Sequence, residues 1–165
     1  MIYLAHGASG NAKSMQPYVD GLKARKLRAQ AVGLPVRKAE ETVGNYREQV
    51  ADYPNAVIGG HSYGGRVASL LAAQERPKGL VLLSYPLHRP GHPEALRTEH
   101  WQHIECPVLL LSGEADQFAR IELLRIAVNL LPDAQLVTYP GVRHGLTSVL
   151  DDALNRIAEF VEKLG

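Results

Sequence analysis

The chain has 165 residues, of which 45% are hydrophobic and 21% are charged, and its formal net charge at pH 7 is +1. This composition is typical of a soluble globular protein, and the length predicts a single domain, residues 1–165, with one core. The near-neutral charge gives no electrostatic reason to expect nucleic-acid or membrane partners, and the longest apolar runs, 80–83 and 108–111, are too short to span a bilayer.

Short apolar runs alternate with helix-length periodic segments along the chain. From the N-terminus they predict a strand at 2–5, a helix at 14–26, a strand at 27–32, a helix at 39–51, a strand at 56–60 and a helix at 67–74. There follow a strand at 79–84, a short helical stretch at 94–103, a strand at 107–112, a helix at 121–131, a strand at 135–139 and an amphipathic helix at 149–164. This alternation predicts an α/β fold: a six-stranded parallel sheet in the order 2-1-3-4-5-6, with helices on both faces.

The most informative stretch is AVIGGHSYGGR, residues 56–66, where an apolar strand meets a glycine-rich turn and then a helix. Ser62 sits in the pattern G-x-S-x-G, between Gly60 and Gly64. Such a turn holds the serine in a strained conformation at the carboxyl edge of the sheet, and it needs small residues on either side because neighbouring backbone passes close by. The stretch therefore predicts a nucleophilic serine. A glycine-rich turn with an incidental serine is the alternative.

A nucleophilic serine needs an acid and a base on loops at the same edge of the sheet. After the fifth strand comes Gly113-Glu114-Ala115-Asp116, and we expect Asp116 to be the acid, with Glu114 as its competitor. His144 follows the sixth strand and is the only histidine after Asp116, so we expect it to be the base. His61 flanks the serine, and its side chain is expected to point elsewhere.

Stabilisation of the reaction intermediate requires backbone N–H donors near the serine. Tyr63 begins the helix after Ser62, so its amide is one predicted donor. The loop His6-Gly7-Ala8-Ser9-Gly10 follows the first strand, and the amide of Ala8 is the second. Taken alone, this loop is more typical of a glycine-rich strand-to-helix turn, and its combination with Ser62, Asp116 and His144 favours the role in oxyanion binding.

The chain resembles the α/β-hydrolase superfamily over nearly all its length, and within it the small dienelactone-hydrolase-like branch. The stretches HGASG (6–10), GGHSYGGR (59–66), LSYPLHRPGHPEALR (83–97) and PVLLLSGEAD (107–116) carry the resemblance. They are most similar to the group of the testis-expressed hydrolase-like protein and the hydrolase-like subunit of the animal non-specific-lethal complex. The resemblance implies Ser62 as nucleophile, Asp116 as acid and His144 as base, with the backbone amides of Ala8 and Tyr63 as oxyanion donors.

The chain departs from the larger members of that superfamily. Its first predicted strand comes directly before the oxyanion loop, and only about twenty residues separate its fourth and fifth strands, so no inserted lid is expected and the site should be open. We expect residues 85–97 to form one wall of the site, with Tyr85, Leu87, His88 and Arg89 contacting substrate. In the alternative, Arg97 and His88 only hold this proline-rich loop through hydrogen bonds to carbonyl groups.

The sequence thus predicts a serine hydrolase that cleaves an ester, thioester or similar acyl bond of a small molecule through an acyl-enzyme. The alternative is a non-catalytic protein of the same fold that binds a partner. No metal-ligand cluster or nucleotide loop is visible, so no metal and no cofactor are expected. Cys106 is the only cysteine, and no basic and apolar leader precedes the first strand, so a cytoplasmic location is expected. Nothing in the sequence indicates an oligomeric state.

Overall fold

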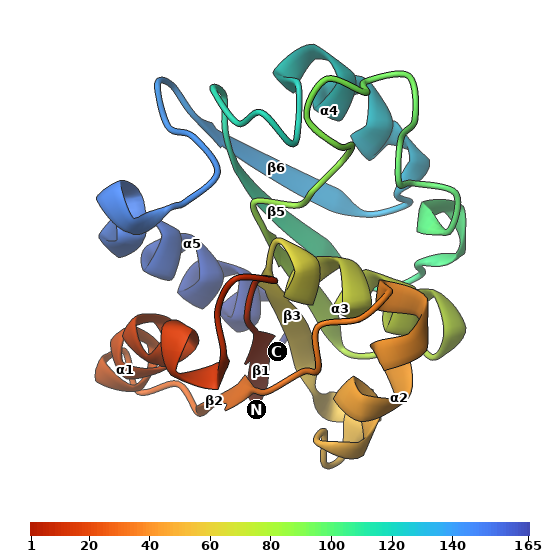
Figure 1. Ribbon diagram of the computed structural model, residues 1–165. Helices are drawn as coiled ribbons and strands as arrows, with labels where there is room; N and C mark the ends of the chain where they lie inside the picture. The colour runs from red at the N-terminus through yellow and green to blue at the C-terminus, as the bar shows by residue number, and fades with distance from the viewer.

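A parallel sheet in the order β2-β1-β3-β4-β5-β6 forms the middle layer of the computed structural model, which describes residues 1–165 (Figure 1). The strands are β1 (Ile2–Ala5), β2 (Ala29–Val32), β3 (Val57–His61), β4 (Gly79–Leu83), β5 (Val108–Gly113) and β6 (Ala134–Tyr139). Every neighbouring pair is parallel. The predicted fold class and strand order are confirmed.

Helices cover both faces of the sheet (Figure 1). One face packs against α2 (Ala39–Glu48), α3 (Tyr63–Gln74) and α4 (Ile121–Ala127), and the other against α1 (Gln16–Ala24) and α5 (Leu150–Lys163). Apolar side chains on alternate positions of the strands therefore divide between two cores, one under each helical layer. No helix combines the length and the apolar character needed to cross a membrane.

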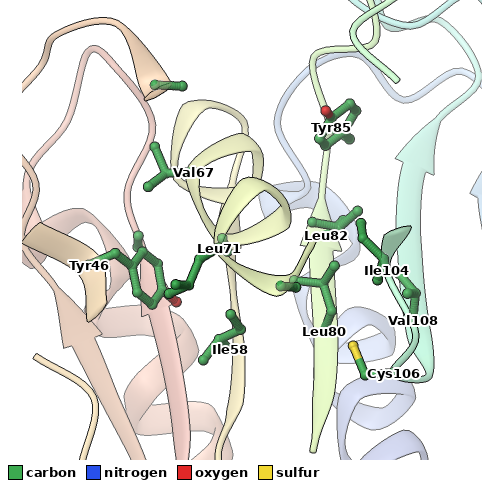
Figure 2. Close-up of a cluster of buried hydrophobic side chains, with 14 of the residues drawn as sticks. Tyr46, Ile58, Val67, Leu71, Leu80, Leu82, Tyr85, Ile104, Cys106 and Val108 are labelled. Atoms are coloured by element: carbon green, nitrogen blue, oxygen red, sulfur yellow. The ribbon is translucent and has the colours of Figure 1, made fainter. Parts of the chain in front are cut away.

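The core between the sheet and α3 is built from aliphatic and aromatic side chains (Figure 2). Ile58, Leu80 and Leu82 are fully buried on the strands, and Leu71 faces them from α3. Tyr46 of α2 is also fully buried; its hydroxyl accepts a hydrogen bond from the Gly59 amide at 2.9 Å and lies 2.7 Å from the Gly59 carbonyl oxygen. Because its polar end is paired, the ring adds buried area without an unsatisfied group.

Two helix predictions need correction. Residues 94–103 form no α-helix, and only a short 3-10 turn, Trp101–His103, is present. That segment is held instead by contacts with distant residues, such as the 2.6 Å hydrogen bond from the Tyr85 hydroxyl to the Arg97 carbonyl. Helix α3 begins at Tyr63, four residues earlier than expected. The first helical turn of α3 contains Gly64 and Gly65, which the sequence pattern assigns to the connection between the strand and the helix.

Candidate active site

Three side chains from separate loops meet at the carboxyl edge of the sheet. Ser62 follows β3, Asp116 follows β5 and His144 follows β6. The Ser62 Oγ lies 2.8 Å from His144 Nε2, and His144 Nδ1 lies 2.8 Å from Asp116 Oδ2. Parallel strands deliver their loops to one edge, which explains how residues 28 and 82 positions apart in the chain come into contact.

Ser62 has a strained backbone conformation, with φ 49° and ψ −115°. The strain is sustained by very close packing, because a Cβ atom at either Gly60 or Gly64 would lie 2.5 Å from the carbonyl oxygen of Ala5. Only glycine fits at these two positions. The turn therefore presents the Ser62 hydroxyl above the end of α3, on the side where His144 lies.

Asp116 is buried, and its side chain has no exposed area. Its Oδ1 accepts a hydrogen bond from the Phe118 amide at 2.8 Å, and its Oδ2 accepts the one from His144. Since a carboxylate only accepts, His144 carries its proton on Nδ1, and Nε2 is free to accept the Ser62 hydroxyl proton. Glu114 is engaged elsewhere: its Oε1 accepts from Thr138 Oγ1 at 2.8 Å.

The loop that carries His144 is tied to its surroundings on several sides. The Val142 carbonyl accepts a hydrogen bond from the Ala115 amide at 2.9 Å, which joins this loop to the loop of Asp116. The Phe118 ring packs on the His144 ring, with 4.2 Å between centroids. These contacts restrict the imidazole to a position between the serine and the carboxylate.

His61 is directed toward the site, contrary to expectation. Its Nε2 lies 3.0 Å from the His144 carbonyl oxygen and must donate, since a carbonyl only accepts. Burial lowers the pKa of His61, which favours the neutral ring. The sequence gives no signal for this hydrogen bond. The direction of the His61 side chain depends on the geometry of β3, and its partner is 83 residues away.

The loop after β1 is fixed by His6, which is buried. Its Nε2 accepts a hydrogen bond from the Leu34 amide at 3.0 Å, so its Nδ1 carries the proton and donates to the Gly7 carbonyl at 2.7 Å. The next residue, Ala8, lies outside every helix and strand, and its amide donates to no backbone acceptor. Tyr63 is the first residue of α3, where an amide lacks an intrahelical partner.

A cavity of about 700 Å³ opens beside these groups. Its lining comes from the loops that follow the six strands, the last residue of β3 and the first turns of α2 and α3: Gly7, Ala8, Ser9, Arg37, Lys38, Ala39, Glu40, His61, Ser62, Tyr63, Arg66, Pro86, Arg89, Arg97, Phe118 and His144. Ser62, His144, Ala8 and Tyr63 therefore share one cavity. Nothing in the sequence pattern places Arg37, Lys38 or Phe118 there.

The expectation for residues 85–97 is wrong in part. Tyr85, Leu87 and His88 are at most 1% exposed and do not line the cavity, whereas Arg89 does. Figure 2 shows Tyr85 with the buried core side chains. His88 has both ring nitrogens occupied, by the Arg120 amide at 3.0 Å and the Arg89 carbonyl at 2.8 Å. Apolar packing and hydrogen bonds to backbone groups thus hold Tyr85, Leu87 and His88 in the interior, away from the cavity.

A parallel sheet with this order, and with Ser, His and Asp on its carboxyl-edge loops, defines the α/β-hydrolase class. Residues 1–159 match the family described as alpha/beta hydrolase domain, and the chain belongs to it. Solved structures agree on the fold: Est1E from Butyrivibrio proteoclasticus with ferulic acid bound superposes with a TM-score of 0.81 at 17% identity, covering 99% of this chain and 88% of that one. A monoacylglycerol lipase from Paleococcus ferrophilus gives a TM-score of 0.83 at 15% identity, covering 99% and 94%.

Characterised relatives match over shorter stretches. A bifunctional esterase/perhydrolase from Acinetobacter calcoaceticus is 35% identical over 60 residues, which is 36% of this chain and 22% of the relative. A non-heme chloroperoxidase from Burkholderia pyrrocinia is 40% identical over 63 residues, 38% of this chain and 23% of the relative. The matched segment is thus under a quarter of each relative.

Proposed function

We propose that this protein is a serine hydrolase that cleaves an ester, thioester or similar acyl bond of a small molecule. The observation that carries the proposal is the chain of two 2.8 Å contacts from Ser62 Oγ through the His144 ring to Asp116. A serine hydroxyl is a weak nucleophile until a base removes its proton, and the base needs a third group to fix its orientation. Ser62, His144 and Asp116 meet these requirements in that order.

The proposed reaction has two halves. Ser62 Oγ attacks the acyl carbon while His144 Nε2 takes its proton; the bond to the leaving group then breaks, and the leaving group receives that proton. Water attacks the acyl carbon of the resulting acyl-enzyme and gives a proton to His144. The bond between Ser62 Oγ and the acyl carbon then breaks, Oγ takes that proton back from His144, and the acid product leaves. Asp116, whose side chain is buried and lies 2.8 Å from His144 Nδ1, stabilises the imidazolium form in both halves.

The amides of Ala8 and Tyr63 are proposed to hold the negative oxygen of the tetrahedral intermediate. Both residues line the cavity beside Ser62. Ala8 has an amide without a backbone acceptor, and Tyr63 lies at the N-terminus of α3, where the helix dipole adds positive potential. Donors of this kind contribute roughly 3–4 kcal/mol each to lowering the barrier in enzymes of this type.

We further propose that the chain belongs to the small branch containing the testis-expressed hydrolase-like protein and the hydrolase-like subunit of the non-specific-lethal complex. The stretch from Leu83 to Arg97 supports this assignment. Some members of that branch act in protein complexes, so a non-catalytic binding module of the same fold is the alternative, and the following test distinguishes the two.

A fluorophosphonate probe tests the proposal, with labelled sites mapped by peptide mass spectrometry. We expect labelling of Ser62 in the wild type and none in Ser62→Ala. The matched control is Ser69→Ala: Ser69 Oγ also lies 2.7 Å from a histidine Nε2, that of His100, but it is buried and does not line the cavity. That variant should label normally. A folded wild type that reacts with no probe would instead support the non-catalytic alternative.

A further inference from the structure

The cavity beside Ser62 is strongly cationic. Five of the chain's 18 Lys and Arg residues line it, against one of its 17 Asp and Glu residues, although the whole chain carries only +1. The cations are Arg37, Lys38, Arg66, Arg89 and Arg97. The single acid, Glu40, pairs with Arg66 at 2.7 Å, and the other four cations make no salt bridge. The positive charge here is thus largely uncompensated.

Three of these guanidinium groups also line a second, smaller cavity of about 350 Å³. Arg66, Arg89 and Arg97 belong to both cavities, so they form the boundary between them. Burial lowers the pKa of Arg97, and the charges of Arg66 and Arg89 lower it further, while Tyr85 and Glu40 act in the opposite direction. A bound anion would reduce the repulsion among these like charges.

The cluster is positioned relative to the reactive serine by helix α3. Arg66 lies in its first turn, and its amide donates to the Ser62 carbonyl at 3.0 Å. Arg66 and Ser62 also line the same cavity, so an anion held by Arg66 would share that cavity with an acyl group on Ser62.

These arginines are not needed to hold the loop in which two of them lie. The Arg97 backbone is fixed by its amide, which donates to the Leu87 carbonyl at 2.8 Å, and by its carbonyl, which accepts from Tyr85 at 2.6 Å. His88 ties the same loop to Arg120. The Arg97 guanidinium itself makes only a 3.4 Å contact with the Pro86 carbonyl. The backbone is thus held while the charged group stays free for a ligand.

We propose that Arg66, Arg89 and Arg97 form an anion subsite, and that the substrate is an acyl ester or thioester bearing a carboxylate or phosphate close to the scissile bond. Guanidinium groups pair with both anions through two parallel hydrogen bonds, which gives orientation as well as affinity. The proposal rests on the serine hydrolase function above, and it specifies the class of molecule on which that function acts.

Four phenyl acetates of similar size test it, differing in the para group: carboxylate, phosphate, neutral methyl carboxylate and cationic trimethylammonium. We expect kcat/KM to be at least about tenfold higher for one or both anionic esters than for the neutral ester, and lowest for the cation. Arg89→Gln and Arg97→Gln should each remove most of this preference. A preference for carboxylate over phosphate, or the reverse, identifies which anion the subsite takes.

The control is Arg28→Gln, which removes the same charge from an exposed arginine at the amino end of β2, outside both cavities. It should keep the anion preference.

A second measurement, calorimetric binding of the uncleavable anion 4-acetamidobenzoate and of its neutral methyl ester, does not depend on hydrolysis. Anion binding lost in Arg89→Gln supports the subsite even if no ester is cleaved, in which case the hydrolase proposal alone fails. Equal kcat/KM for anionic and neutral esters, with no difference in binding, overturns the subsite and leaves the hydrolase proposal standing.

Discussion

The side chain of His61 donates a hydrogen bond to the backbone carbonyl of His144 at 3.0 Å, while the next residue, Ser62, contacts the side chain of the same histidine. Two neighbouring residues of one turn therefore hold both the backbone and the ring of His144. Serine and histidine are thus fixed relative to each other by a second link besides the reactive contact.

We expect His61→Phe to slow acylation of Ser62 about tenfold, equivalent to about 1.4 kcal/mol, because the loop of His144 loses this hydrogen bond. His61→Gln keeps an N–H donor and should recover most of the rate. Stopped-flow acylation by an activated ester measures the effect, and thermal melting shows whether the fold is retained. Equal rates in the Phe and Gln variants would show that the contact does not position His144.

Close packing at the turn before α3 predicts opposite effects for two glycine substitutions. Gly60→Ala would place a Cβ 2.5 Å from the Ala5 carbonyl oxygen, and we expect it to lower the free energy of unfolding by more than about 3 kcal/mol. Gly44→Ala on α2 meets nothing within 4 Å and should raise it by about 0.5–1 kcal/mol, since alanine favours the helix. Urea unfolding compares the two. Similar effects at both positions would contradict this account of the turn.

His88 is expected to stabilise the fold rather than contact substrate. It is 1% exposed, and both ring nitrogens pair with backbone groups. His88→Ala should lower the free energy of unfolding by about 2–3 kcal/mol and leave the ranking of the para-substituted acetates unchanged. His92→Ala, in the same loop but exposed, should stay within about 0.5 kcal/mol of the wild type. A changed substrate ranking in His88→Ala would restore the original expectation that it contacts substrate.

His100 predicts a loss of stability in acid. Burial, followed by the charge of Arg66, lowers its pKa from 6.5 to about 4. Above pH 6.5 the ring is neutral in both folded and unfolded chains; between about 6.5 and 4 the unfolded chain binds the proton first, so stability falls as the pH falls. His100→Gln should flatten this part of the profile of unfolding free energy against pH, whereas His103→Gln, at an exposed site, should not. Superimposable profiles for the wild type and His100→Gln would rule out this contribution.

The sheet and the positions of Ser62, Asp116 and His144 follow from the sequence because they depend on local signals. Apolar runs mark the strands, parallel connections set their order, and glycine-flanked loops end at one edge. β1 is observed at Ile2–Ala5, as predicted, because Gly7 and Gly10 leave little ambiguity about where it ends.

The directions of side chains on irregular loops are less predictable. Tyr85 and Leu87 are apolar residues near the site, and whether they face the cavity or the core is decided by packing with Trp101, whose ring lies 5.0 Å from that of Tyr85. Arg37 and Lys38 reach the cavity from the loop after β2, with no motif to mark them. The cationic character of the site is therefore visible only after folding.

The most direct test of the proposed function is the detection of the acyl-enzyme. The protein is mixed with 4-nitrophenyl acetate, quenched in acid within one turnover, and examined by intact mass and peptide mapping. The account predicts one acetyl group on Ser62 in the wild type, more persistent in His144→Gln if acylation still occurs, and none in Ser62→Ala. An acetyl group on another residue, or hydrolysis that continues at the wild-type rate in Ser62→Ala, would contradict it.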